Sequence, residues 1–259
     1  MVINIVNYIG LLFLWILNSV GNFCLFFFKS LKTFFTTKPK IIKSFFQMEQ
    51  IGFNSTSIIL LTGFSTGAVL ALQSYIGFKR FGSEDLIGPL VALSMTRELG
   101  PVLTGLMVTG RCCSAMAAEI GAMRVSEQID AITTLRINVF QYLIVPRILA
   151  STIILPFLTL FSMICGIIGG YIVCVYVLNL NGEQYKAGIR IYLELNDITG
   201  GLVKSSFFGL ILSLVGTYKG FNTSGGARGI GTSTTQSVVL GSILILITNY
   251  FLASWLFEA

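Results

Sequence analysis

A few charged side chains lie inside stretches that are otherwise apolar, and they are the residues whose types could do chemistry. Arg97 and Glu98 interrupt the apolar stretch 86–112, and Lys204 interrupts the apolar stretch 198–218. If these stretches cross a membrane, an isolated charge in them costs at least about 2.5–3.5 kcal/mol. We therefore expect each charge to face a water-filled cavity or an oppositely charged partner.

Two further polar residues extend this set. Asp197 lies two helical turns before Lys204, and Asn249 lies deep in the apolar stretch 229–257. One interpretation is a polar patch inside a helix bundle, where it would contact the headgroup of an amphiphile. The other is a set of structural ion pairs between helices, which would contact no ligand.

Enzyme and metal chemistry is poorly supported. The chain has no histidine, and its five cysteines form no C-x-x-C motif, so we expect neither a metal site nor another cofactor. Residues 63–67 match G-x-S-x-G by letter, but no base accompanies them, and Gly63, Gly67 and Ala71 predict a stripe for close helix packing. The glycine-rich run 225–231 lacks the lysine of a nucleotide-binding P-loop and predicts a connecting loop.

The composition indicates a membrane protein. Of 259 residues, 54% are hydrophobic and 11% are charged, which is less than half the share of about 25% in soluble domains. These values exclude a soluble globular enzyme, a disordered chain and a small disulfide-rich secreted domain. They predict an all-α, polytopic bundle of membrane helices, because every backbone group in lipid must be bonded internally.

Five membrane spans follow from the positions of the charges, since a span needs about 20 apolar residues. The predicted spans are 50–78, 86–112, 148–182, 198–218 and 229–257. The stretch 148–182 is long enough for one kinked helix or a re-entrant pair, and one helix fits the loop charges better. Residues 1–28 also lack charge and either span the membrane or lie in its interface.

The loop charges predict the orientation of the spans. Segments 29–49 and 113–147 carry most of the basic residues that lie outside the apolar stretches, so both are placed on the cytoplasmic or stromal side. The C-terminus then lies on the opposite side. This bias also explains the net charge of +6, and nucleic-acid binding is not needed to explain it.

A short amphipathic helix is predicted over 119–136, between two spans. Met123, Ile129 and Ile132 recur at helical spacing, whereas Glu127 and Asp130 occupy other faces. One interpretation is a helix that docks into a soluble partner, and the other is a helix that rests on the bilayer. The acidic residues argue against an anionic membrane surface, so docking is preferred.

Several motifs resemble the signature of the MlaE family, which comprises permease subunits of lipid-transporting ABC systems. The matching residues are TRELGPVL at 96–103, GR at 110–111 and AAEIGAMRVSEQIDA at 117–131. Further matches include VPR at 145–147 and KS at 204–205, and the resemblance covers about residues 45–257. It divides the chain into an N-terminal hydrophobic and basic segment, 1–48, and a permease domain, 49–259.

The resemblance implies a homodimer with five membrane-crossing helices and an N-terminal interfacial helix in each chain. It implies that 119–135 is the coupling helix that docks on an ABC ATPase, which binds the ATP, and that an MCE-domain lipid-binding protein lies on the far side. The coupling residues would be Glu119, Gly121, Met123, Arg124, Glu127, Gln128 and Asp130.

The polar patch would then line the lipid pathway. Its residues are Arg97, Glu98, Asp197, Lys204 and Asn249, and the bacterial phospholipid permease of the family carries an acid at the last position. The resemblance implies a non-catalytic permease subunit that moves membrane lipids. A secondary transporter for a small polar solute is the alternative, motivated by the charges in the membrane, and a membrane-embedded lipid enzyme is a third possibility.

The location is predicted from coding bias. Abundant phenylalanine (21 residues), without a start typical of a transit peptide, suggests an AT-biased genome such as that of a plastid. We therefore expect a plastid-encoded protein of the inner envelope membrane, with a bacterial inner membrane as the alternative.

Overall fold

The computed structural model describes residues 2–37 and 41–257, and every regular element within these ranges is helical. Five helical stretches are long and apolar enough to cross a membrane, which confirms the predicted polytopic all-α bundle. They are Ile41–Phe81, Glu84–Val125, Phe140–Val177, Leu195–Phe221 and Gly226–Phe257.

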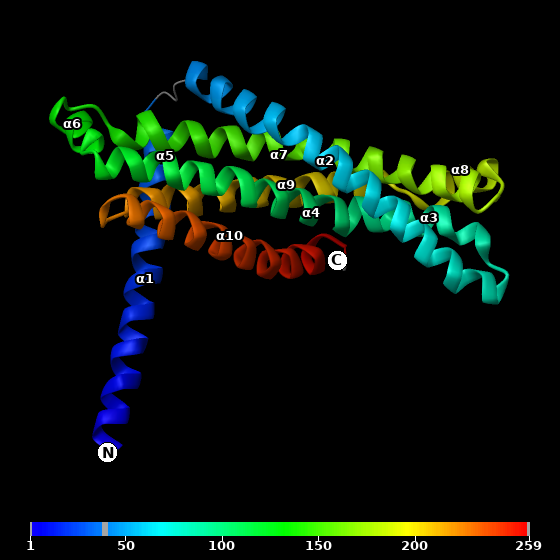
Figure 1. Ribbon diagram of the computed structural model, residues 1–259, viewed down its shortest axis with the longest axis horizontal. Helices are drawn as coiled ribbons and strands as arrows, with labels where there is room; N and C mark the ends of the chain where they lie inside the picture. Colours follow the sequence, from blue (N-terminus) through cyan, green and yellow to red (C-terminus); the bar gives the residue numbers. More distant parts are fainter. Residues whose placement is uncertain (1, 38–40, 258–259) are drawn as a thin grey trace.

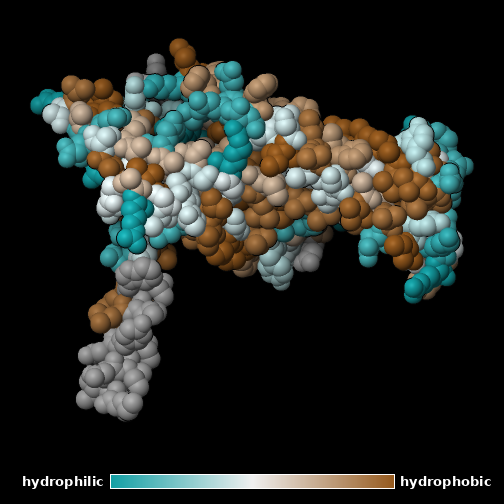
Figure 2. All heavy atoms as spheres, viewed as in Figure 1, coloured by the Kyte–Doolittle hydropathy of each residue, from teal (hydrophilic) through white to brown (hydrophobic). Residues whose placement is uncertain are grey.

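The spans lie side by side, with α6 (Gln128–Thr134) at one end and α8 (Gly182–Tyr192) at the other (Figure 1). Hydrophobic side chains dominate the middle of the bundle, and hydrophilic ones gather at both ends (Figure 2). This pattern suits a bilayer, whose core is about 30 Å thick. We call the end with α6 the inner end, because the positive-inside rule places its basic segments there.

The individual helices differ from the predicted spans mainly in length. The first span is α2 (Ile41–Phe78), which runs without a break across the predicted domain boundary at 48/49. The third is one long helix, α7 (Val145–Ile172), with π-helical turns at Phe140–Ile144 and Val173–Val177. This continuity confirms one helix over most of 148–182.

The second span is one continuous helix with two local defects. It consists of α3 (Ile87–Ser94), α4 (Gly100–Val108) and α5 (Ser114–Val125), joined by the π-helical turns η3 (Met95–Leu99) and η4 (Thr109–Cys113). A π turn inside an α-helix often marks a functional position. Here η3 contains the two adjacent charges singled out in the sequence.

Glycines permit the close contact between α2 and α7. A side chain at Gly67 would collide with the backbone of Gly166, and one at Gly63 would meet the carbonyl oxygen of Ser162 at 2.8 Å. Both α2 glycines are buried, as is Ala71 one turn further on. The predicted small-residue stripe is therefore a helix-packing surface, as in other membrane bundles.

The fourth span, α9 (Leu195–Phe221), is the centre of the bundle. It packs against α4, α5, α7 and α10 (Gly226–Phe257), the fifth span. Its Phe208, Leu212 and Val215 are fully buried. Residues placed on α9 can therefore reach several neighbouring spans.

The first helix runs across the direction of the spans. In Figure 1, α1 (Val2–Thr36) crosses the bundle near its inner end and extends away from it. Its second half packs against the bundle, with Phe26 against the rings of Phe140, Tyr218 and Phe221. This direction fits the interfacial alternative for residues 1–28 and not the spanning one.

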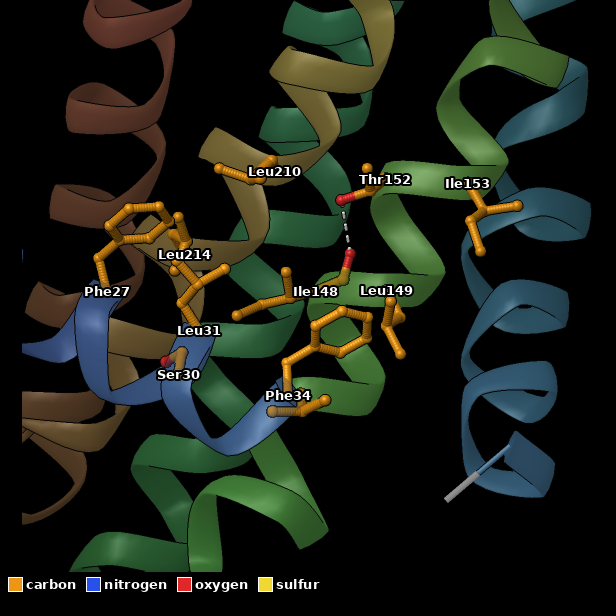
Figure 3. A pocket seen from close by; sticks show the side chains of 11 residues that line it. Phe27, Ser30, Leu31, Phe34, Ile148, Leu149, Thr152, Ile153, Leu210 and Leu214 are labelled. Carbon is orange, nitrogen blue, oxygen red and sulfur yellow. Dashed lines mark hydrogen bonds between the residues drawn. The ribbon is translucent and has the colours of Figure 1, made fainter. Parts of the chain in front are cut away.

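An apolar cavity of about 160 Å³ lies between α1, α7 and α9 (Figure 3). Phe27 and Phe34 of α1 border it together with Leu149 of α7 and Leu214 of α9. The hydroxyl groups of Ser30 and Thr152 each donate to a carbonyl of their own helix, so the lining offers no free hydroxyl hydrogen.

Two sequence predictions need correction. The helix predicted over 119–136 is broken: α5 ends at Val125, and α6 begins at Gln128 after Glu127, whose φ of 59° is left-handed and cannot continue a helix. The predicted glycine-rich loop is mostly helix. The turn there uses Gly225 and Gly226, with φ of 87° and 66°, and the later glycines belong to the first turns of α10.

Helix α8 lies outside the spans and packs against α3 through Tyr185. This side chain is buried, its hydroxyl donates to the carbonyl of Ile167 over 3.2 Å, and burial raises its pKa. On the exposed side, Lys186 Nζ lies 3.0 Å from Glu183 Oε1. This hydrogen bond lowers the pKa of Glu183 and raises that of Lys186.

Candidate polar site within the bundle

The five polar residues predicted from the sequence lie together in the structure. Arg97 and Glu98 lie in the π turn η3, Asp197 and Lys204 on α9, and Asn249 on α10. Hydrogen bonds join them into two groups, which we call the polar cluster. The cluster lies toward the outer end, where α9 begins and α10 ends.

The first group is centred on Glu98. Its Oε1 accepts a hydrogen bond from Lys204 Nζ over 2.8 Å, and its Oε2 accepts one from Asn249 Nδ2 over 3.0 Å. Lys204 is fully buried, whereas the Glu98 side chain is 41% exposed. One carboxylate thus connects the second, fourth and fifth spans.

A proline explains a further bond of Lys204. Pro101 has no N–H, so it cannot donate to the carbonyl four residues earlier, that of Arg97. The Lys204 ammonium group donates to this carbonyl over 3.0 Å. The lysine therefore satisfies a backbone acceptor inside the bundle as well as a carboxylate.

The second group pairs Arg97 with Asp197. Arg97 Nη2 lies 2.6 Å from Asp197 Oδ1, and its Nε donates to the same oxygen over 2.7 Å. Asp197 Oδ2 accepts the backbone N–H of Glu194 over 2.9 Å, as part of a capping box at the start of α9. This cap fixes the carboxylate, which is 2% exposed, while the guanidinium side chain remains 41% exposed.

An aromatic ring lies beside both cations. The centre of the Phe257 ring is 5.1 Å from the Arg97 guanidinium carbon and 5.4 Å from Lys204 Nζ, within the range of cation–π attraction. A side chain at Gly200 would meet this ring at 2.8 Å, so the glycine makes room for it.

The cluster contains ion pairs between helices, and it also leaves two of its charges partly exposed. Each ion pair has one buried member that belongs to the scaffold and one half-exposed member. Arg97 and Glu98 therefore present a positive and a negative group side by side on an apolar bundle. Both groups have hydrogen-bonding positions left free. These positions can bind a polar headgroup whose charges are complementary to those of Arg97 and Glu98.

The residues of the predicted coupling helix lie at the inner corner between α5 and α6. Glu127, Gln128 and Asp130 are exposed, and Asp130 accepts a hydrogen bond from Arg124 over 2.6 Å across the corner. Met123 packs against a cluster of buried hydrophobic side chains that includes Ile120 and Ile129, and Gly121 is buried beneath Thr223. Gly121 and Met123 therefore lie inside the corner, whereas Glu127, Gln128 and Asp130 lie on its surface.

Glu119, another predicted coupling residue, points toward α7. Its Oε2 lies 2.7 Å from Nη2 of Arg147, a buried arginine at the start of that helix. Residue types alone gave no signal for this pair. Nor did the sequence single out Phe257, whose aromatic side chain is typical of a span end, or the effect of Pro101 on Lys204.

Comparison with known proteins identifies the family. The family model described as Permease MlaE matches residues 44–255. A probable ABC transporter permease protein of Rickettsia conorii is 49% identical over 212 residues, which cover 82% of each chain.

Two more distant relatives have more specific names. The chloroplastic protein TRIGALACTOSYLDIACYLGLYCEROL 1 of Arabidopsis thaliana is 37% identical over 82% of this chain and 61% of its own. The intermembrane phospholipid transport system permease protein MlaE of Haemophilus influenzae is 34% identical over 82% of each chain. The sequence, the five-span helical fold and these matches agree: this chain belongs to the MlaE family of permeases.

Proposed function

We propose that this chain is the membrane-spanning subunit of an ABC transporter that moves lipids, and that the polar cluster contacts the lipid headgroup. The observation that carries the proposal is the half-exposed pair of Arg97 and Glu98 within apolar spans. The names of the Haemophilus and Arabidopsis relatives refer to phospholipid transport and to a glycolipid, which supports a lipid substrate.

In this proposal the chain itself is not catalytic. A separate ATPase subunit binds ATP and contacts the inner corner, where Glu127, Gln128 and Asp130 are exposed. Movement of the corner passes along the continuous second span to η3, which holds both half-exposed charges. ATP hydrolysis would thereby change how the cluster holds a headgroup, through a shift between two states of the bundle.

The wider assembly is part of the proposal. We place two copies of this chain with two ATPase subunits, and an MCE-domain lipid-binding protein at the outer end. The membrane is the inner membrane of a bacterium or the inner envelope of a plastid, since the relatives include bacterial proteins and a chloroplastic one. Antibody labelling in fractionated cells of the source distinguishes the two membranes.

Neutral variants of the cluster test the headgroup role. Arg97→Gln and Glu98→Gln each remove one exposed charge and keep the size of the side chain. We expect each to lower ATP-driven transfer of labelled lipid at least about tenfold, because a hydrogen bond to a charged group is worth about 1.5–3 kcal/mol. Transfer is measured between vesicles containing the assembled complex and acceptor vesicles.

Arg80→Gln is the matched control, because it makes the same change at an exposed position outside the cluster. Wild-type rates in both cluster variants, with the complex assembled, would contradict the headgroup role. Ion-driven uptake of a small solute by the chain alone in liposomes would instead establish the secondary transporter. Turnover of labelled lipid by the chain alone would establish a lipid enzyme.

Charge reversal at the inner corner tests the ATPase contact. Glu127→Lys and Asp130→Lys invert exposed charges, and the second also removes the pair with Arg124. We expect weaker co-purification with the ATPase and loss of lipid-stimulated ATP hydrolysis, because an inverted charge opposes a complementary surface. Asp85→Lys, near the outer end, is the control, and equal behaviour of all three variants would contradict the contact.

A further inference from the structure

A second cavity, lined by both polar and apolar residues, lies at the inner end of the bundle, where the start of α2 passes the start of α7. Its volume is about 350 Å³, and its lining includes Lys43 and Gln47 of α2 with Tyr142 and Arg147. Hydrophilic side chains gather over this region in Figure 2. The cavity is at the opposite end of the spans from the polar cluster.

Arg147 is a buried lining residue of this cavity whose side chain is held by two hydrogen bonds. The side chain is 93% buried; its Nη1 donates to the carbonyl of Leu143 over 2.8 Å and its Nη2 to Glu119 over 2.7 Å. Its Nε, also buried, has no partner among the residues that the structure describes. The guanidinium is therefore held in place in the cavity wall by its two bonds, and its charge attracts an anion that enters the cavity.

The charges around the cavity favour an anion. Lys43 and Arg147 are its basic lining residues, and among the residues that the structure describes none of those lining it is acidic. Glu119, the acid nearest to Arg147, is already paired with it and lines a neighbouring cavity of about 230 Å³ that also contains Arg111. Gln47 lines both cavities, so the two are adjacent. Their linings together contain the basic residues Lys43, Arg111 and Arg147 and the acidic residue Glu119, so an anion there meets more positive than negative charge.

The level of the cavity points to a lipid as the source of the anion. Lys43 precedes the apolar part of the first span, and Arg147 begins the charge-free stretch of the third. Both therefore lie where headgroups of the inner leaflet meet the protein. The apolar cavity of Figure 3 lies beside the same first turns of α7, and its lining contains no charged residue.

We propose that the cavity between α2 and α7 binds the phosphate of an anionic phospholipid in the inner leaflet, through Lys43 and Arg147. This inference rests on the proposed function, because it assumes that the chain handles lipids in a bilayer. It adds a specific site on the side of the membrane opposite to the polar cluster.

The test measures bound anionic lipid directly. The assembled complex is placed in nanodiscs of phosphatidylcholine with phosphatidylglycerol, and native mass spectrometry counts the phosphatidylglycerol retained after release. The double variant Lys43→Gln/Gln47→Leu changes the cavity lining and leaves the buried arginine in place. We expect a roughly tenfold weaker retention, the effect of losing a charge-assisted hydrogen bond. Arg147→Lys keeps the charge but cannot form both bonds of the guanidinium, so the charge is no longer held at the cavity and retention should also fall.

Lys32→Gln is the matched control, since Lys32 is exposed on α1 and carries the same charge outside the cavity. Equal loss in this control would show only general attraction to a basic surface and would overturn the site. Displacement by soluble glycerol phosphate would overturn the lipid as the ligand. Unchanged retention in the cavity variants, while the wild-type complex transports lipid, would overturn this inference alone. Specific retention without any lipid transport would overturn the proposed function, and the lipid-binding site would still be supported.

Discussion

Lys204 shows how a charge can be kept inside an apolar bundle. It is fully buried, and its ammonium group donates to Glu98 and to the carbonyl of Arg97. Breaking a buried ion pair on one side costs about 3–5 kcal/mol, because the remaining charge is left unpaired. Here the cost is smaller, since the Glu98 side chain is partly exposed and keeps its hydrogen bond from Asn249.

We therefore expect Lys204→Met to lower the free energy of unfolding by about 2–3 kcal/mol, measured by steric trapping in bicelles. The double variant Lys204→Met/Glu98→Gln should lose less than the single one, because it leaves no unpaired carboxylate. An additive or larger loss in the double variant would contradict the ion pair as the cause.

The sequence predicted which polar residues gather, but not how they pair. Arg97 and Glu98 lie in an apolar span, where an unpaired charge costs free energy, so their need for partners could be predicted from the sequence. Their partners depend on the π turn and on the rotation of α9, which no local pattern encodes. The contact of Phe257 with both cations could not be predicted, because it depends on where α10 ends relative to α9.

At the scale of the elements, glycines set the distance between helices. Gly67 of α2 lies against the backbone of Gly166, so an added methyl group has no space there. We expect Gly67→Ala to destabilise the fold by about 1–3 kcal/mol, the usual cost of overpacking. Unfolding in bicelles again provides the measurement.

The same helix offers a control for this prediction. Gly77→Ala adds its methyl group where nothing lies within 4 Å, and alanine is the better helix former by about 1 kcal/mol. This variant should be neutral or slightly stabilised. If both variants behave alike, the close approach of α2 and α7 does not limit stability.

The elements were predictable to different degrees. Charge-free runs identified the spans, because lipid excludes unpaired charges and exposed backbone groups. The break between α5 and α6 was not predictable, since Glu127 adopts a left-handed conformation for which its residue type has no preference. The glycine-rich run likewise contains both a turn and helix, and only the two glycines at the turn need positive φ.

For the whole molecule, five spans place α6 and α8 on opposite sides of the membrane. We expect Ser126→Cys, in the exposed inner corner, and Gln184→Cys, exposed on α8, to react with a membrane-impermeant maleimide from opposite sides. Labelling is compared in right-side-out and inverted vesicles, with Cys24→Ser as the background because Cys24 is exposed. Reaction of both sites from one side would contradict the five-span topology.

The overall charge distribution was readable from the sequence, whereas the direction of α1 was not. Its apolar residues satisfy the length of a span, and only the packing of Phe26 against Phe140 and Tyr218 shows that it crosses the bundle. Such docking depends on aromatic side chains from segments that are far apart in the sequence.

The bond between Lys204 and the Arg97 carbonyl also has an evolutionary consequence. The lysine supplies the hydrogen that Pro101 withholds, so the two positions constrain each other although about a hundred residues separate them. A descendant that replaces the proline regains the backbone hydrogen and relaxes the selection on the lysine. A descendant that first loses the lysine removes this donor from the carbonyl while the proline still cannot replace it. Substitutions at these two positions are therefore easier to accumulate in one order than in the other.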